Sequence, residues 1–275
     1  MNFTKMQGLG NDFIVIADRA ELPADHAELA KRWCDRHFGI GADGVVYILP
    51  SEKADFSMRI INADGSEAEQ CGNAIRCVAK YVFDRGLTEK RELTIETIGA
   101  GVQPVQLQVE AGHTVSVRVN MGEPILEGLR IPTTLDMNPV IDRPIYADGA
   151  DFRFTAVSMG NPHSVIFVED APSFDLHRYG PLLEVHELFP KRVNVEFATV
   201  RSRDHVDMRV WERGAGPTLA CGTGACATLV ATVLNGKTDR TATVSLTGGD
   251  LLIEWAADNV IYMTGAAEFV FDGAV

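Results

Sequence analysis

Two stretches of the chain carry apolar residues at the spacing of a helix face. In the first stretch they recur at intervals of three and four positions, as on one side of an α-helix: Ile75, Val78, Ala79, Val82 and Phe83. The second stretch, ACATLVATVLN at 225–235, contains no charged residue, so we expect a helix that is buried on every side. Gly86 and Gly236 follow the two stretches, where a glycine commonly ends a helix.

Short apolar or alternating segments predict β-strands around both helices. In the first half they are residues 13–17, 58–61, 93–95 and 115–119, and in the second half residues 165–168, 208–211, 251–255 and 260–263. Residues 122–150 are rich in Pro, Gly and Asp, which predicts a connector with little regular structure. Residues 269–271 are expected to return as a strand to one of the two halves.

The two halves of the chain align with each other at an offset of 150 residues. The matching pairs are Gly10-Asn11 with Gly160-Asn161, Met58-Arg59-Ile60 with Met208-Arg209-Val210, Cys71-Gly72 with Cys221-Gly222, and Gly86 with Gly236. The identities gather at Gly, Asn and Cys, so we interpret the pattern as an internal duplication. The sequence therefore predicts an α/β (α+β) fold of two pseudo-symmetric domains that meet near residue 120. Each is expected to be a strongly curved, mostly antiparallel sheet around one buried helix.

Composition narrows the class of protein. The chain has 275 residues, of which 46% are hydrophobic and 23% charged, as in soluble globular proteins. Its net charge of −13 argues against nucleic acid as a partner, because that binding rests on Lys and Arg at phosphates. No run of 18 apolar residues and no secretory signal pattern stands out. We therefore expect a cytoplasmic protein with neither a nucleic-acid nor a membrane partner.

Two of the five cysteines stand directly before Gly at the start of a predicted helix. Unpaired N–H groups and the positive end of the helix dipole collect there, which acidifies a thiol and favours a bound carboxylate. If Cys71 and Cys221 flank one substrate carbon, one thiolate can take its proton while the other thiol returns one. Such an inversion needs neither pyridoxal phosphate nor a metal, so no cofactor is expected. Both could instead be packing cysteines, but the symmetric placement favours chemistry.

The remaining cysteines fit the core better than a site. Cys77 and Cys226 fall inside the predicted helices, and Cys34 lies in the amphipathic stretch AELAKRWCDRHF. A zinc site is the alternative, but the cysteines of this chain do not form the two matching C-x2–4-C pairs that such a site usually has. We therefore expect no bound metal.

The residues around the paired cysteines resemble a known family. NADGSEAEQCGNAIRC (62–77) and WERGAGPTLACGTGACAT (211–228) closely resemble the two active-site motifs of the diaminopimelate epimerase family. LGNDFIVIAD (9–18), GIGADG (39–44), MGNPHSVIFV (159–168) and RVNVEF (192–197) extend the resemblance over essentially the whole chain. It implies a first domain of residues 1–118 plus 265–275, a second of 119–264, and a homodimer. It also implies interconversion of LL- and meso-2,6-diaminopimelate, a step toward lysine and peptidoglycan.

The resemblance assigns roles to individual residues. Cys71 and Cys221 match the two proton-transfer cysteines, and His163 and Glu212 match positions that tune the thiols. Arg213 can take the distal carboxylate as a fork, and Glu212 can take an ammonium. The implied substrate-binding set is Asn11, Gly44, Asn62, Gly72, Asn73, Asn161, Asn194, Glu212, Arg213, Gly222 and Thr223.

The chain departs from the family pattern at three positions within the motifs. Gly44 stands where some members carry Gln, so any substrate contact there must come from backbone or water. Pro217 and Ala74 stand where an acidic residue and Gly are common. These differences concern local geometry rather than the class of reaction.

Other readings of the same residues remain open. A proline-type racemase or a phenazine-pathway isomerase resembles the duplicated fold, although Glu212-Arg213 favours a substrate with a second charged end. A thiol–disulfide oxidoreductase would be expected to carry C-x-x-C, which the chain lacks. A non-catalytic binding protein of duplicated fold would tolerate loss of Cys71.

Overall fold

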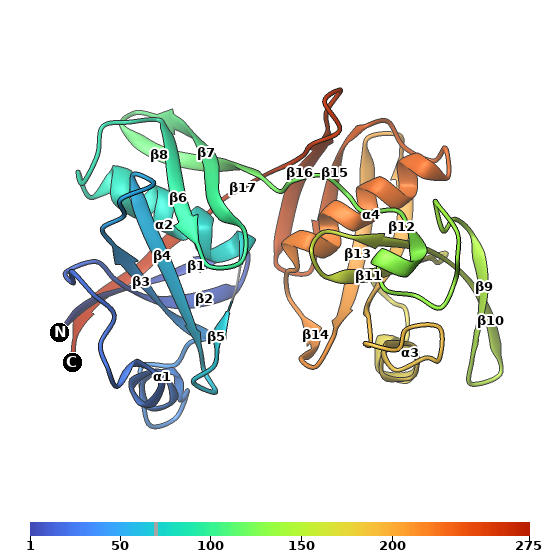
Figure 1. Ribbon diagram of the computed structural model, residues 1–275, viewed down its shortest axis with the longest axis horizontal. Helices are drawn as coiled ribbons and strands as arrows, with labels where there is room; N and C mark the ends of the chain where they lie inside the picture. The colour runs from blue at the N-terminus through green and yellow to red at the C-terminus, as the bar shows by residue number, and fades with distance from the viewer. Residues whose placement is uncertain (69–70) are drawn as a thin grey trace. The chain divides into compact units, whose positions relative to one another are not determined.

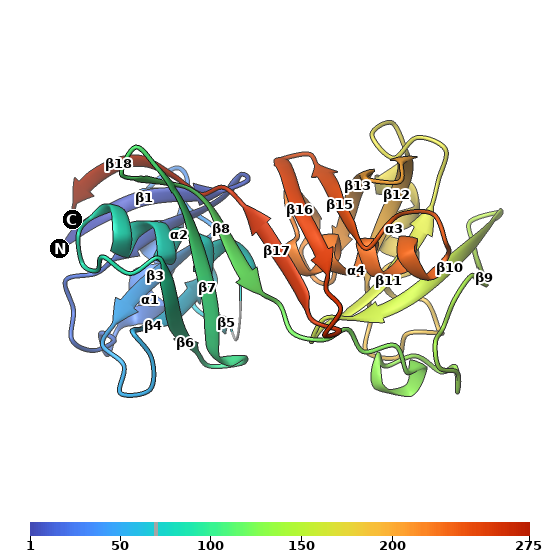
Figure 2. The same ribbon diagram turned by 90° about the horizontal axis from the view of Figure 1, so that it is seen from above.

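The computed structural model describes residues 1–68 and 71–275 (Figure 1 and Figure 2). Glu69 and Gln70 of the first motif lie outside the described residues. The chain divides into two compact units. Unit 1 comprises Met1–Asn120 and Thr264–Val275, and unit 2 comprises Met121–Met263.

Unit 1 is a mixed sheet with one helix inside its curve and another outside. In chain order its elements are β1 (Asn2–Gly8), β2 (Asn11–Ile16), α1 (His26–Cys34), β3 (Gly44–Leu49), β4 (Phe56–Asn62), β5 (Glu67–Ala68), α2 (Gly72–Asp84), β6 (Glu92–Thr97), β7 (Gly101–Glu110), β8 (His113–Asn120) and β18 (Glu268–Ala274). The pairs β2–β3 and β4–β6 are parallel. The pairs β1–β18, β1–β2, β3–β4, β4–β5, β6–β7 and β7–β8 are antiparallel. The returning segment at 269–271 thus joins the first half, beside β1.

Helix α2 occupies the centre of unit 1. It packs against β1, β2, β4, β6, β7 and β8, and Figure 2 shows the strands around it. Its apolar face is buried, and Gly86 follows its C-cap with a φ of 73°, a left-handed conformation that glycine adopts without strain. Helix α1 covers the other face of β3 and β4 through Trp33. Strands buried on both faces read as continuous apolar runs, as in Phe13–Ile16.

Unit 2 repeats this arrangement. Its elements are η1 (Gly128–Arg130), β9 (Arg143–Ala147), β10 (Ala150–Ser158), β11 (Pro162–Phe167), α3 (Leu176–Glu184), β12 (Asn194–Ser202), β13 (His205–Glu212), β14 (Gly216–Thr218), α4 (Gly222–Leu234), β15 (Thr241–Leu246) and β16 (Gly249–Trp255), and β17 (Ile261–Gly265) follows. The pairs β11–β12 and β13–β15 are parallel. Helix α4 packs against β10, β11, β12, β13, β15 and β16.

The predicted duplication is confirmed by the register of the strands and by the helix bounds. Helices α2 and α4 span 72–84 and 222–234, and α1 and α3 span 26–34 and 176–184, each pair at an offset of 150. The parallel partners Phe13 and Gly44 recur as His163 and Asn194. The expected α+β fold, a curved sheet around a buried helix in each half, is therefore what the chain adopts.

Several elements were not predicted, among them β7 and α3, and one expectation was too simple. Strand β7 alternates buried and exposed residues, but its Gln and Pro positions hide that alternation. Helix α3 contains Pro181 and begins at Leu176, directly after the N-cap Asp175, whose side chain accepts from the Arg178 N–H. The connector at 122–150 is not wholly irregular, because β9 forms within it. Strand β9 pairs with β10 and buries Ile145 and Ala147.

Within residues 1–68 and 71–275, no helix is both long enough and apolar enough to cross a membrane. The three cysteines assigned to the core are buried there: Cys34, Cys77 and Cys226.

Burial of Cys77 predicts a loss of stability at alkaline pH. Burial raises the pKa of the Cys77 thiol to about 12, against an ordinary value of 9.0. If the pKa of a thiol is higher in the folded chain than in the unfolded chain, the thiol does not change the unfolding free energy while the pH is below its pKa in the unfolded chain. Stability then falls as the pH rises between the two values. At pH 10 the unfolded chain gains about 1.4 kcal/mol by ionising this thiol.

Urea unfolding at pH 8 and pH 10 measures this effect. The difference in unfolding free energy between the unsubstituted protein and Cys77→Ala should shift by about 1.4 kcal/mol in favour of the variant at the higher pH. Comparison with the variant cancels the titration of lysines and tyrosines. An identical difference at both pH values would contradict a buried thiol.

Candidate functional site

The two cysteines singled out by sequence occupy equivalent places at the starts of α2 and α4. Cys71 is the N-cap of α2, with φ −150° and ψ 111°, and Cys221 is the N-cap of α4, with φ −128° and ψ 107°. Gly72 and Gly222 are the first residues of the helices, and Asn73 and Thr223 the second. Backbone N–H groups of a first turn lack helical partners, so each cysteine lies beside donors that suit an anion.

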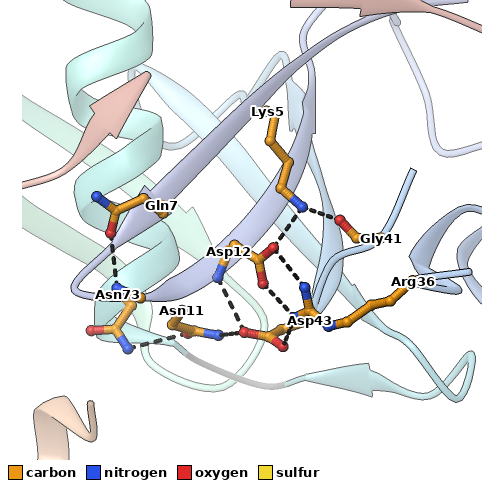
Figure 3. A network of polar contacts seen from close by, with 9 residues as sticks. Lys5, Gln7, Asn11, Asp12, Arg36, Gly41, Asp43 and Asn73 are labelled. Carbon is orange, nitrogen blue, oxygen red and sulfur yellow. Dashed lines mark hydrogen bonds and ion pairs between the residues drawn. The ribbon is translucent and has the colours of Figure 1, made fainter. Parts of the chain in front are cut away.

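Near Cys71, one asparagine side chain joins the thiol to the first turn of α2. The Asn11 Oδ1 accepts from the Cys71 Sγ at 3.7 Å and from the Asn73 Nδ2 at 3.1 Å. Figure 3 shows Asn11 and Asn73 at one end of a polar network. The fold therefore brings together three residues of the predicted set in unit 1.

The rest of that network lies behind Asn11 and was not predicted as part of a site (Figure 3). Asp43 accepts from the Asn11 Nδ2 at 2.6 Å, and Arg36 pairs with both Asp43 and Asp12 at 2.7 Å. Lys5, which is almost buried, pairs with Asp12 at 2.6 Å and donates to the Gly41 carbonyl. Burial by itself raises the pKa of the Asp12 carboxyl, but hydrogen bonds and charges from Arg36 and Lys5 lower it to about 2. Asp12 is therefore ionised at neutral pH.

Gly44 and Asn62 face each other at the ends of β3 and β4. The Asn62 Nδ2 donates to the Ser66 Oγ at 3.0 Å. A Cβ at position 44 would lie 2.9 Å from the Ile61 carbonyl oxygen, closer than real contacts allow. A side chain at position 44 would therefore require this backbone to shift.

Cys221 lies in a more enclosed and more acidic environment, with 5% of its surface exposed. Its Sγ accepts from the Gly224 N–H at 3.4 Å and lies 3.6 Å from the Thr223 Oγ1. Burial raises the pKa of the Cys221 thiol well above its ordinary value, and the charges of Glu212 and Glu196 raise it further. The Thr223 and Gly224 donors act in the opposite direction. Without substrate, Cys221 is therefore held as a thiol.

Glu212 lies at the end of β13, next to Cys221. Burial raises the pKa of its carboxyl, while hydrogen bonds from Thr218 and Cys221 and the charge of His163 lower it. A carboxyl with a raised pKa beside a thiol can exchange a proton with it. This geometry suits the tuning role that the resemblance implies.

A buried histidine and a buried carboxylate lie next to Asn161, the counterpart of Asn11 in unit 2. The His163 Nδ1 lies 2.7 Å from the Glu196 Oε1, and both side chains are fully buried. The His163 Nε2 lies 2.9 Å from the Asn161 Oδ1, and the Asn161 Nδ2 donates to the Thr223 Oγ1 at 3.3 Å. Glu196 was missed by sequence reasoning, although a lone glutamate inside the apolar run VNVEFATV was a signal.

Asn194 and Arg213 also lie together. The Asn194 Nδ2 donates to the Pro162 carbonyl at 2.8 Å, and its Oδ1 accepts from the Arg213 N–H at 2.9 Å. The Arg213 guanidinium donates to the Lys191 carbonyl at 3.3 Å. Glu184, another residue missed from sequence, accepts from the Gly214 N–H at 2.9 Å and so fixes the same turn.

The predicted residues thus form one group in unit 1 and one in unit 2. In the described part of the chain, no group of three or more His, Cys, Asp or Glu side chains is arranged to hold a metal ion. The chemistry available to the described side chains is that of thiols, carboxylates, an imidazole and backbone donors.

Comparison with known proteins assigns the chain to a family. The sequence model of diaminopimelate epimerase matches residues 3–127 and 155–270. The chain belongs to the diaminopimelate epimerase family. The diaminopimelate epimerase of Desulfitobacterium hafniense is 54% identical to this chain, and that of Acetivibrio thermocellus is 56% identical. Each match covers all of this chain and 98% of the relative. A member from Methanococcus maripaludis is 55% identical over all of this chain and 99% of its own length.

Solved structures extend the family's fold to more distant proteins. A phenazine biosynthesis protein from Bacillus anthracis has a TM-score of 0.72 at 19% identity and covers all of this chain and 98% of its own. A probable proline racemase from Agrobacterium radiobacter has a TM-score of 0.72 at 16% identity and covers all of this chain and 92% of its own. At these identities the likeness shows the fold alone.

Proposed function

We propose that this protein is a cofactor-independent epimerase that interconverts LL- and meso-2,6-diaminopimelate. Support comes from its membership of a family whose curated relatives carry that name at 54–56% identity over the full chain. The observation that carries the chemistry is the duplicated placement of Cys71 and Cys221 as N-caps of equivalent helices. Diaminopimelate epimerisation serves lysine and peptidoglycan synthesis, which also fits a cytoplasmic enzyme.

In the proposed reaction the two cysteines exchange one proton each with the substrate carbon. A thiolate on one face removes the α-proton and becomes a thiol. The bonding pair spreads from the carbon onto the adjacent carboxylate. The thiol on the opposite face donates its proton to the carbon and becomes a thiolate, so charge and protons balance. The reverse direction exchanges the roles of Cys71 and Cys221.

Helix N-termini provide the electrostatic part of this proposal. Charge accumulates on the carboxylate during proton removal, and preorganised N–H donors stabilise it most at that moment. Gly72 and Asn73 in unit 1, and Gly222 and Thr223 in unit 2, are placed to offer such donors. Glu212 and His163 would adjust the protonation of Cys221.

The other end of the substrate carries a second amino-acid group that is bound but not inverted. Arg213 is proposed to take its carboxylate with two parallel N–H groups, and Glu212 its ammonium. The remaining contacts are assigned to Gly44 through its backbone and to the asparagines Asn11, Asn62, Asn161 and Asn194. Asn194 already uses both ends of its amide within the protein, so it offers the substrate one further N–H.

A direct assay tests the proposed function. Purified protein is incubated with LL-diaminopimelate, without added cofactor, and the isomers are separated by chiral chromatography. We expect meso-diaminopimelate to form until both isomers reach equilibrium. Proline and hydroxyproline serve as comparison substrates. Inversion of proline without any conversion of diaminopimelate would assign the chain a racemase activity instead.

The assembly proposed for the enzyme is a homodimer. Strand β18 pairs with β1, and it exposes Val270 and Phe271, whose burial by a second copy would be favourable. Light scattering coupled to gel filtration should give twice the mass of one chain. A single-chain mass at micromolar concentration would rule the dimer out.

A further inference from the structure

In both halves an asparagine contacts the first turn of the central helix, but with the opposite end of its amide group. In unit 1, residue 11 contacts residue 73, and in unit 2, residue 161 contacts residue 223, at the same offset of 150. Asn11 presents its amide oxygen to α2, where it accepts from Cys71 and Asn73. Asn161 presents its amide nitrogen to α4, where it donates to Thr223. Something other than local sequence must set each orientation, because both are asparagines after glycine.

In unit 1 the orientation follows from the chemistry of Asp43. Its Oδ1 accepts from the Arg36 Nη2 at 2.7 Å. Its Oδ2 accepts from the Asn11 Nδ2 at 2.6 Å and from the Asp12 N–H at 3.1 Å. An ionised carboxylate only accepts hydrogen bonds. The nitrogen of the Asn11 amide must therefore face Asp43, which leaves its oxygen facing Cys71.

Asp43 is itself held by a network of alternating charges. Arg36 bridges Asp43 and Asp12, and Asp12 also pairs with the nearly buried Lys5. Figure 3 shows this network running from Lys5 to Asn11 and Asn73. Two cations face two carboxylates, so the ion pairs hold the Asp43 side chain in place.

In unit 2 a different pair of residues gives the opposite result. The His163 Nδ1 lies 2.7 Å from the Glu196 Oε1, and the His163 Nε2 lies 2.9 Å from the Asn161 Oδ1. An amide oxygen accepts only, so a hydrogen bond between these two atoms requires the proton on the His163 Nε2. The Asn161 nitrogen is thereby directed to Thr223. Asn161 in unit 2 thus contacts a donor, His163, on the side away from its helix. Asn11 in unit 1 contacts an acceptor, Asp43, on the corresponding side.

We propose that Asp43 is a positioning residue that fixes Asn11 with its amide oxygen toward the Cys71 thiol. The Asn11 oxygen then accepts from the S–H group and favours the protonated form of Cys71. Asp43 acts through Asn11 and does not touch the substrate. The importance of this role for turnover rests on the proposed function, but its effect on the thiol can be measured without substrate.

The substitution Asp43→Asn tests the role without changing the size of the side chain. The charge of Arg36 keeps the new amide oxygen on its own side, so the new NH2 group faces Asn11 and the hydrogen bond from the Asp12 N–H is lost. Asn11 must then turn its oxygen toward residue 43 and its nitrogen toward Cys71. A donor near the sulfur favours the thiolate, which is the reactive form. Since the Asp43 side chain is 42% exposed, the variant is expected to fold.

Two matched variants distinguish a change in the orientation of the Asn11 amide from a general loosening of the surrounding loop. Asp55 also accepts from a cation, a backbone N–H and a hydroxyl, through Lys90 and Thr94. It precedes β4 and lies roughly 20 Å along that strand from Asn62, so Asp55→Asn controls for loss of such a carboxylate. Arg36→Gln removes the ion pair but leaves an acceptor-only carboxylate facing Asn11.

The measurement is the rate of iodoacetamide alkylation at pH 8, resolved by peptide mass spectrometry, with a phosphine reductant and no substrate. In Asp43→Asn, Cys71 should react roughly three- to ten-fold faster, with Cys221 unchanged. In Asp55→Asn and Arg36→Gln, Cys71 should keep its original rate. A Cys71 rate in Asp43→Asn within two-fold of the unsubstituted protein would overturn the proposal. So would the same acceleration in Arg36→Gln, or an equal change at Cys221, because either result indicates a loosened loop. Failure of the proposed function is a separate outcome, seen as absence of epimerisation by the unsubstituted protein.

Discussion

Replacing either Cys71 or Cys221 with alanine is expected to lower the rate of diaminopimelate epimerisation by about 10³-fold or more, because general acid–base groups commonly contribute 10² to 10⁴ each. A carbon that loses its proton on one face must receive one on the other to be inverted. With one thiol missing, either the base or the acid is absent. The loss should appear in kcat for both directions of the reaction.

Cys77→Ala and Cys226→Ala are the matched controls for these variants. Both cysteines lie in α2 and α4, one to two turns beyond the helix starts, and both are fully buried. Their replacement removes a thiol from the same helices without touching the N-caps, so kcat should change by no more than a few-fold. An active Cys71→Ala or Cys221→Ala enzyme, with no thiol reagent present, would contradict the assignment.

The substitution Glu212→Gln should produce the second large effect, a fall in kcat of about 100-fold or more. Glutamine keeps the shape of the side chain and an oxygen for the Thr218 hydroxyl. It cannot take up a proton from Cys221 or carry charge for the substrate ammonium. Glu184→Gln controls for loss of a buried carboxylate in the same unit. Glu184 holds Trp211 and Gly214 and is not among the groups that shift the pKa of the Cys221 thiol, so this variant should leave the reactivity of Cys221 unchanged.

A second measurement on Glu212→Gln gives a change of opposite sign. The charge of Glu212 raises the pKa of the Cys221 thiol, so its removal lowers that pKa. The thiolate fraction at pH 8 then rises, and Cys221 should be alkylated faster in the absence of substrate although epimerisation is slower. A variant with unchanged kcat and unchanged Cys221 reactivity would remove Glu212 from the chemistry.

The parts of the fold that follow from local pattern were predictable from sequence. The helix at 222–234 was expected because it contains no charge, and the helix at 72–84 because its apolar residues recur at three and four positions. The placement of Cys71 and Cys221 at the helix starts followed from the glycine after each. The duplication was detectable because glycines and cysteines, whose roles are difficult to replace, kept their positions in both halves.

What sequence could not show depends on contacts between distant positions. Asp43 contacts Asn11 across 32 residues, and Glu196 contacts His163 across 33. In each case a parallel pair of strands, β2–β3 or β11–β12, brings the residues together, and no local pattern encodes that register. Glu196 was visible as a charge within an apolar strand, but its partner was not. Helix α3 was hidden for a different reason, because an internal proline obscures its periodicity.

The central claim is that two cysteines, and not one base, invert the substrate carbon. A single base can return the proton that it removed, whereas two bases on opposite faces deliver a different proton from the one abstracted. The decisive measurement is epimerisation in D2O, in which deuterium at the α-carbon of product and of remaining substrate is followed by mass spectrometry at early times. The two-cysteine mechanism predicts product with deuterium at the inverted carbon and substrate that stays largely unlabelled, in both directions. Product that retains its original hydrogen would contradict it.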